Sequence, residues 1–440
     1  MDFSAFPHSG EQLVRRWVAR SRLAVRRPRR FELALSLAAL AVAFPARADF
    51  TCSTVTRSFL LDPDGATLSN SWGSEVGVNG SGGVVFVARV IGGKDKLYLY
   101  PGAGSPLTVA SANGPSPNGG VFRATRPFAD LSINDGNDVG FWGRLQVGQG
   151  VFVRPSGGPT KTAAVTTGTS PGGGAYLTFP HVSNVNSSGQ VAFYATVSGG
   201  PSGVFLYDSG TDLTTVVLLN NDPTTGGREI CSVDDLGLGD SGAVAIRAPS
   251  KVDCTNAGEP AVNGVFLDRG PIDAIAFIGD PTPIGGTTYS SFVLPPLVSS
   301  SDHVAFRGNV IGAVKTSAVF LSDFSGPTIT KIVARGDSSP AGGGVGTIFS
   351  FAFANTDQVA IRANVSASAA KTGILEFGGA PATVVVRSST PPTDLFGVGT
   401  TYSSFSNPSI AADASHAATI VRVHDTVSPG SKHGVEVCVP

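Results

Sequence analysis

The feature that most constrains this chain is a short motif that recurs seven times along it. The clearest copy is the segment 186–195, NSSGQVAFYA, and the residue aligned with its Phe193 recurs at intervals of 52 to 60 residues. The aligned residues are Phe86, Phe141, Phe193, Ile246, Phe306, Ile361 and Thr419. Sustained self-similarity at such a period is typical of propellers and solenoids. We therefore expect one repeat domain rather than a series of separate domains.

Each copy of the repeat contains four segments with the composition of β-strands, bounded by Gly, Pro, Asn and Asp. In the third copy these segments are 177–185, 191–195, 203–207 and 213–219. Four short strands in each of seven copies predict an all-β fold, a seven-bladed β-propeller with four antiparallel strands per blade. A parallel β-helix would show a period near half this length, and separate β-sandwiches would need about 100 residues each.

The first 48 residues have the features of a signal peptide. An arginine-rich stretch precedes an apolar run from Leu33 to Phe44, and Ala46-Arg47-Ala48 is a small-x-small cleavage signal. Twelve apolar residues are too few to span a bilayer. The sequence therefore predicts a secreted or periplasmic protein in which residues 49–440 form a single propeller domain.

Removal of residues 1–48 changes the charge balance of the chain. This segment holds nine of the 31 basic and three of the 32 acidic residues, so 22 basic and 29 acidic residues remain, a net charge of −7. A negative surface repels phosphate backbones, which argues against nucleic acid as a partner. No apolar stretch long enough for a membrane span follows the cleavage signal. We also expect the protein to be a monomer.

The two ends of the mature chain predict how the ring closes. The last copy has three strand segments, the third of them at 434–437, and its fourth strand is missing. A spare strand, Val55 to Leu61, lies near the mature N-terminus. Pairing this strand with the last blade would complete the blade and remove two open sheet edges.

The four cysteines fit the same closure. Four cysteines in an exported chain imply up to two disulfides, with three possible pairings. Cys438 ends the third strand of the last blade and Cys52 just precedes the spare strand, so the two are expected to be neighbours in an antiparallel hairpin. Cys231 and Cys254 flank a turn within blade four. We therefore predict the disulfides Cys52–Cys438 and Cys231–Cys254, the alternative being free buried thiols.

Short motifs with catalytic associations are better explained by the repeat. Residues 168–172 match the Gly-x-Ser-x-Gly nucleophile elbow, but they lie in an inter-blade loop with no helix after them. His424 and His433 lie near Asp425 in one loop of blade seven, where a metal or catalytic role is the alternative to a structural one. We assign no catalytic residue, no metal site and no cofactor from the sequence.

The tandem motif resembles a family of secreted bacterial repeat proteins marked by Asn-x-x-Gly-x-x-Ala-Phe and often found with varied C-terminal surface anchors. Asn186, Gly189, Ala192 and Phe193 match this motif fully, and other copies match it in degenerate form. The resemblance implies an exported repeat protein and implies no activity. The anchor of that family is not found in this sequence.

Two functions remain open at this stage. The first is a binding or interaction module at the cell exterior, with a carbohydrate, a peptide or another envelope protein as its ligand. The alternative is a secreted propeller hydrolase or lyase that acts on glycans, which would need convergent carboxylates or a metal on one face.

The ligand is expected on one particular side of the ring. The connections from fourth to first strand and from second to third strand emerge on the same side of every blade, and loops on a rigid scaffold usually carry binding sites. The residues predicted to meet a ligand over the central channel on this side are Asp280, Arg335, Asp337, Arg387, His424 and His433.

Overall fold

The computed structural model describes residues 50–440 except 103, 324–327, 367–371, 379–381, 389–395, 397–399 and 426–429. The expected signal peptide lies outside these residues. The described part belongs to one compact unit, residues 47–440, in which every regular element is a β-strand. It contains no helix that could cross a membrane.

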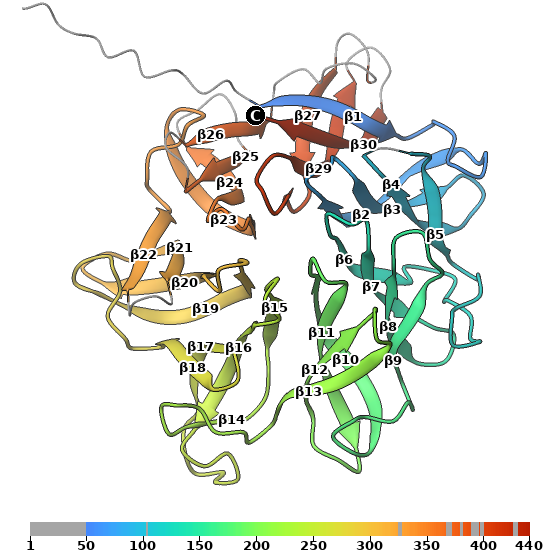
Figure 1. Cartoon of the computed structure of the whole chain (residues 1–440). Helices are drawn as coiled ribbons and strands as arrows, with labels where there is room; N and C mark the ends of the chain where they lie inside the picture. Colours follow the sequence, from blue (N-terminus) through green and yellow to red (C-terminus); the bar gives the residue numbers. More distant parts are fainter. Residues whose placement is uncertain are drawn as a thin grey trace, which may run out of the picture. The chain divides into compact units, whose positions relative to one another are not determined.

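The strands form seven antiparallel sheets arranged in a ring (Figure 1), so the predicted seven-bladed propeller is confirmed. Blades one to three consist of β2 (Leu68–Val78), β3 (Val84–Val90), β4 (Asp95–Tyr100), β5 (Leu107–Ser111); β6 (Phe128–Ile133), β7 (Val139–Arg144), β8 (Gln149–Arg154), β9 (Lys161–Val165); β10 (Ala175–Val185), β11 (Gln190–Ser198), β12 (Gly203–Asp208) and β13 (Leu213–Leu219).

The remaining blades follow the same order from inner to outer strand. Blades four to six consist of β14 (Glu229–Ile230) with β15 (Asp235–Leu238), β16 (Val244–Lys251), β17 (Val262–Asp268), β18 (Ile272–Phe277); β19 (Thr287–Val298), β20 (Val304–Gly312), β21 (Thr316–Asp323), β22 (Thr328–Ala334); β23 (Gly344–Phe353), β24 (Val359–Ser366), β25 (Thr372–Phe377) and β26 (Thr383–Arg387). Blade seven consists of β27 (Thr400–Phe405) with β28 (Ser409–Ile410), β29 (Ala417–Asp425), β30 (Gly430–Val439) and β1 (Thr51–Arg57).

The ring closes as predicted, because β1 pairs with β30 and supplies the fourth strand of blade seven. Cys52 and Cys438 lie directly opposite each other and form a disulfide, and the second disulfide joins Cys231 to Cys254. The closing strand begins four residues earlier than expected, so Cys52 lies within it. It ends before Phe59, whose positive φ of 70° turns the chain out of the sheet.

The repeated phenylalanine belongs to the contact between neighbouring blades. Phe193 on β11 is fully buried and stands opposite Phe205 on β12, with 5.7 Å between the ring centroids. Its cluster includes Val151 and Val153 of blade two. The motif therefore recurs because the second strand of each of blades one to six supplies an aromatic or aliphatic side chain to the adjoining blade.

The repeated asparagine ties one blade to the next through hydrogen bonds. The Nδ2 of Asn79 donates to the backbone oxygen of Asn134 (3.0 Å), and the Nδ2 of Asn134 donates in the same way to Asn186 (2.8 Å). Asn and Gly are the residues that most readily adopt positive φ in tight turns. Only the glycine does so, at 75° for Gly189, while Asn186 accepts backbone hydrogen bonds within its own turn.

Blade seven replaces the aromatic pair by two buried polar residues, Thr419 and Glu436, which stand opposite each other on β29 and β30. The Oε1 atom of Glu436 accepts a hydrogen bond of 2.7 Å from the hydroxyl of Thr54 on β1. A buried carboxylate needs such partners. This contact therefore adds a side-chain link between the closing strand and the last blade.

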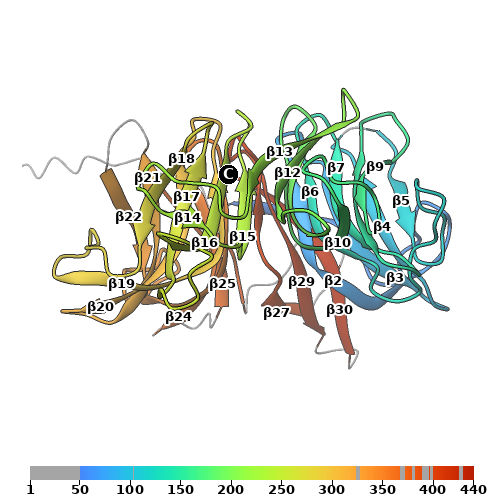
Figure 2. The same cartoon turned by 90° about the horizontal axis from the view of Figure 1, so that it is seen from below.

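The antiparallel order gives the ring two different faces, seen edge-on in Figure 2. On one face, here called the loop side, the outer strand of each blade connects to the inner strand of the next, and the second strand connects to the third. On the other face, the turn side, tight turns join the first strand to the second. The inner strands form the wall of the central channel.

Candidate functional site

The six residues predicted to meet a ligand lie on the loop side, spread over blades four to seven. Asp280 follows β18, Arg335 and Asp337 follow β22, and Arg387 ends β26. His424 and His433, expected in one loop, lie instead on the paired strands β29 and β30, on either side of residues 426–429, which are outside the described part. No hydrogen bond or ion pair joins any two of these six among the described residues.

Asp280 and Asp337 have a definite structural role in their loops. The carboxylate of Asp280 accepts a hydrogen bond from the backbone N–H of Phe277, and that of Asp337 accepts one from Ala334, both at 2.8 Å. Asp337 also pairs with Lys331 at 2.9 Å. These carboxylates close the turn that follows an outer strand, which explains why aspartate recurs at this position.

The arginines and histidines of this set have more open surroundings. Arg335, Arg387 and His424 are exposed, whereas His433 is half-buried. Burial, together with the positive charge of Arg422, lowers the pKa of His433. The structure thus leaves these loop residues separate from one another.

The inner strands carry a group of ionisable residues that the sequence prediction did not include. Glu75 on β2, Asp130 on β6, His181 on β10 and Asp235 on β15 come from four consecutive inner strands, and we call them the charged belt. Each lies four or five positions before the turn at the end of its strand. That shared spacing is the signal in the sequence that could have identified them.

Contacts between neighbouring blades connect the charged belt. A carboxylate oxygen of Glu75 accepts a hydrogen bond from the backbone N–H of Leu131 in blade two (3.3 Å). The Nδ1 of His181 lies 3.3 Å from Oδ1 of Asp235 in blade four. Asp235 in turn forms an ion pair with Arg247 on β16. The belt therefore runs across the boundaries between blades at one level of the channel.

The carboxyl groups of the belt differ in proton affinity. Burial, reinforced by the negative charges of Glu75 and Asp235 and opposed by His181, raises the pKa of Asp130 to about 7. Burial also raises the pKa of Glu75. Burial alone would raise the pKa of Asp235 too, but hydrogen bonds with His181 and Arg247 outweigh it and lower this pKa. The site thus combines one firmly ionised carboxylate with two that protonate more readily.

A cleft of about 460 Å³ opens between blades one and two, next to Glu75 of the belt. Glu75 belongs to its lining, and Val87 and Phe128 contribute apolar surface. Polar groups on its wall include Asp95, which accepts a hydrogen bond from the backbone N–H of Arg126 (2.7 Å). The cleft therefore offers both apolar contact and hydrogen-bonding groups to a ligand.

The turn side of the ring holds a small cavity. This cavity, of about 100 Å³, is lined by residues from all seven blades. The Nδ2 of Asn355 in blade six donates a hydrogen bond to Oδ2 of Asp240 in blade four (2.7 Å). Asp240 also accepts a hydrogen bond from the backbone N–H of Ser187 (2.7 Å). These contacts connect blades three, four and six at this end of the ring.

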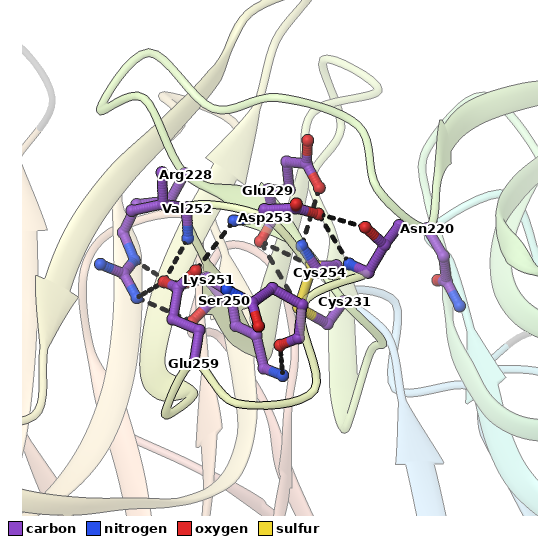
Figure 3. The surroundings of a disulfide bond; sticks show 12 residues. Asn220, Arg228, Glu229, Cys231, Ser250, Lys251, Val252, Asp253, Cys254 and Glu259 are labelled. Carbon is purple, nitrogen blue, oxygen red and sulfur yellow. Dashed lines mark hydrogen bonds and ion pairs between the residues drawn. A yellow bond between two sulfur atoms is a disulfide. The ribbon is translucent and has the colours of Figure 1, made fainter.

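On the loop side of blade four, the Cys231–Cys254 disulfide links the segment after β14 to the loop between β16 and β17 (Figure 3). The side chain of Glu259 accepts hydrogen bonds from the backbone N–H groups of Val252 (2.6 Å) and Asp253 (3.1 Å). Such contacts order the loop 252–261. In the described residues, no group of three or more His, Cys, Asp or Glu side chains is placed to hold a metal ion.

The fold defines the chain as a seven-bladed β-propeller. The chain belongs to a family of unknown function, DUF7453, whose model matches residues 186–435, more than half of its length. The curated proteins contain no significant match to it.

Several solved structures share the fold at low sequence identity. One of two prolyl endopeptidases is similar over 89% of this chain and 50% of its own, at 15% identity and a TM-score of 0.44, so this chain spans about half of its length. The polysaccharide lyase Uly1 is similar over 89% and 99% of the two chains, at 9% identity and a TM-score of 0.41. A PL25 ulvan lyase is similar over 87% and 95%, at 10% identity and a TM-score of 0.39.

Proposed function

We propose that this protein is an exported binding module that takes a hydroxyl-rich ligand, a saccharide, into its central channel from the loop side. The observation that carries the proposal is the 460 Å³ cleft lined in part by Glu75, the first of four ionisable residues on consecutive inner strands. The two disulfides indicate an oxidising compartment, as expected outside the cytoplasm.

The chemistry of the channel wall favours a saccharide. Carboxylates accept hydrogen bonds from hydroxyl groups, and the belt presents Glu75, Asp130 and Asp235 at one level. Because these carboxylates are only half-buried, their desolvation on binding a hydroxyl group costs less than that of fully buried carboxylates would. The apolar part of the cleft, formed by Val87 and Phe128, can cover the C–H surface of a sugar ring.

The proposal is tested by screening the mature protein on a glycan array and measuring hits by titration calorimetry. Glu75→Gln should weaken binding about tenfold or more, the loss expected for one charge-assisted hydrogen bond. The matched control is Asp273→Asn on the outer strand β18, which should leave binding unchanged. Equal affinities for the wild type and both variants would refute the placement of the ligand.

A glycan hydrolase or lyase is the second candidate, and one observation favours it. Asp130, whose pKa is raised, interacts electrostatically with Glu75, whose pKa is also raised, and with the ionised Asp235, and pKa values pushed apart are typical of acid–base pairs. Under this hypothesis, Asp130→Asn should reduce turnover by about 100-fold or more while the ligand still binds. Persistence of intact oligosaccharide with the wild-type protein, measured by mass spectrometry, would leave binding as the sole function.

A further inference from the structure

Three arginines occupy one repeat position, directly after the aligned residue of the second strand. They are Arg247 on β16, Arg307 on β20 and Arg362 on β24. Each replaces an uncharged residue found at this position in the first three blades. The arginines therefore occur in three consecutive blades, four to six.

The first of these arginines is neutralised within its own blade. Arg247 contacts both Asp234 and Asp235, with Nη1 at 3.3 Å from the carboxylate of Asp234. Arg307 and Arg362 form no ion pair with any carboxylate in the described residues. Their Nε atoms are buried and have no hydrogen-bond partner in that same part of the chain. In the described residues, Arg307 and Arg362 thus have no neighbouring carboxylate, whereas Arg247, at the same repeat position, has two.

The local geometry places Arg362 beside the channel. Its Nη1 donates a hydrogen bond of 2.9 Å to the backbone oxygen of Phe405 on inner strand β27. Its guanidinium lies 5.2 Å from the centre of the Phe349 ring on inner strand β23. Phe349 is 39% exposed, although it is a large apolar residue on the innermost strand.

Arg307 lies on the other flank of the same inner strand. Phe306 packs toward blade four, in a cluster with Ala243 and Ala245. Successive side chains of a strand point to opposite faces, so Arg307 points toward blade six. The two arginines therefore lie on opposite sides of β23, where the exposed Phe349 contacts Arg362, and we call these three residues the basic wall.

The basic wall and the charged belt share one level of the ring. Arg362 pairs in register with Ser350 on β23, as Arg247 pairs with Asp235 on β15. In a ring of seven blades, blade six lies across from blades two and three, which carry Asp130 and His181. A ligand in the channel would thus meet carboxylates on one side and arginines on the other.

We propose that the basic wall is a subsite for an oxyanion, so that the saccharide bound in the channel is an acidic one carrying a carboxylate or a sulfate. This inference rests on the proposed saccharide-binding function and adds the charge of the ligand. The guanidinium groups of Arg307 and Arg362 would each bind an acidic group of the ligand, and the face of Phe349 would pack on the sugar ring. The hydroxyl groups of the ligand would meet the charged belt.

Burial supports this assignment. Removal from water lowers the pKa values of both Arg307 and Arg362, since it disfavours the charged guanidinium. An anion bound beside either guanidinium would offset that penalty. Unlike Arg247, neither has a protein carboxylate that does so in the described residues.

The test compares calorimetric affinities for an oligogalacturonate, a sulfated neutral oligogalactoside and the unmodified oligogalactoside. The acidic compounds should bind more tightly than the neutral one, and whichever of the two binds better identifies the anion as carboxylate or sulfate. Arg307→Gln and Arg362→Gln should each weaken acidic binding by about 10- to 100-fold. Arg307→Lys should retain part of the affinity, and raising the salt concentration should reduce it.

The control is Arg269→Gln, in the turn between β17 and β18 on the turn side, which should bind as the wild type does. Unchanged melting temperatures would show that the Arg362 variant, which loses its bond to Phe405, still folds. Equal binding of neutral and acidic compounds, sensitive to Glu75→Gln alone, would overturn the oxyanion subsite and leave saccharide binding intact. Binding of acidic peptides but of no acidic saccharide would overturn both.

Discussion

Asp130 offers a direct measurement of the electrostatics of the channel. It occupies a bulge of β6 with a φ of 50°, and burial is the main cause that raises its pKa to about 7. The substitution Asp130→Asn keeps the shape of the side chain and removes its charge. Asparagine also tolerates positive φ better than most residues, so the backbone should be preserved.

The expected effect on stability follows from the proton linkage. In the unfolded chain Asp130 ionises near pH 3.8, whereas in the folded protein it holds its proton to about pH 7. The folded state therefore binds the extra proton between these values, and its stability falls as the pH rises through this window. A difference of about three pKa units corresponds to at most about 4 kcal/mol. Below pH 4 the contribution is fully present, and above pH 7 it is fully lost.

Urea unfolding of the wild type and Asp130→Asn from pH 4 to pH 8 measures this difference. The variant should match the wild type near pH 4 and become the more stable of the two by about 2–4 kcal/mol at pH 8. For Asp62→Asn, the stability difference from the wild type should change with pH in the opposite direction. Burial raises the pKa of Asp62, but hydrogen bonds from Lys96 and Tyr98 outweigh it, so that this pKa is lowered. The loss of stability caused by Asp62→Asn should therefore be smaller at acid pH. Parallel profiles for Asp130→Asn and the wild type would refute the reasoning.

Three further predictions concern the ring itself. Phe306→Ala removes a ring that is 2% exposed and should cost about 3–5 kcal/mol on chemical unfolding, and a loss below about 1 kcal/mol would show that this residue is not core. Asn134→Ala removes the hydrogen bond to blade three and should cost about 1–3 kcal/mol, whereas an unchanged denaturation midpoint would contradict the role of the asparagines. Peptide mapping without reduction should recover Cys52 linked to Cys438, and reduction should lower the melting temperature; a peptide linking Cys52 to Cys231 would contradict this closure.

Much of the fold could be predicted because it depends on local patterns. The period of the repeat, the strand segments of the third copy and the missing last strand are all properties of consecutive residues. Strand segment 213–219, for example, is β13 without a change of boundary. The disulfide Cys52–Cys438 followed from the same reasoning, since antiparallel pairing of the chain ends leaves few positions for the two sulfur atoms.

The candidate site could not be predicted in this way, because its residues meet only when the ring closes. Glu75 and Asp235 are 160 positions apart in the sequence, yet they belong to one belt because each inner strand faces the same channel. The sequence therefore determined the propeller, its closure and the loop side. Only the tertiary structure decided which side chains line the channel, since the ring brings together one position from each repeat.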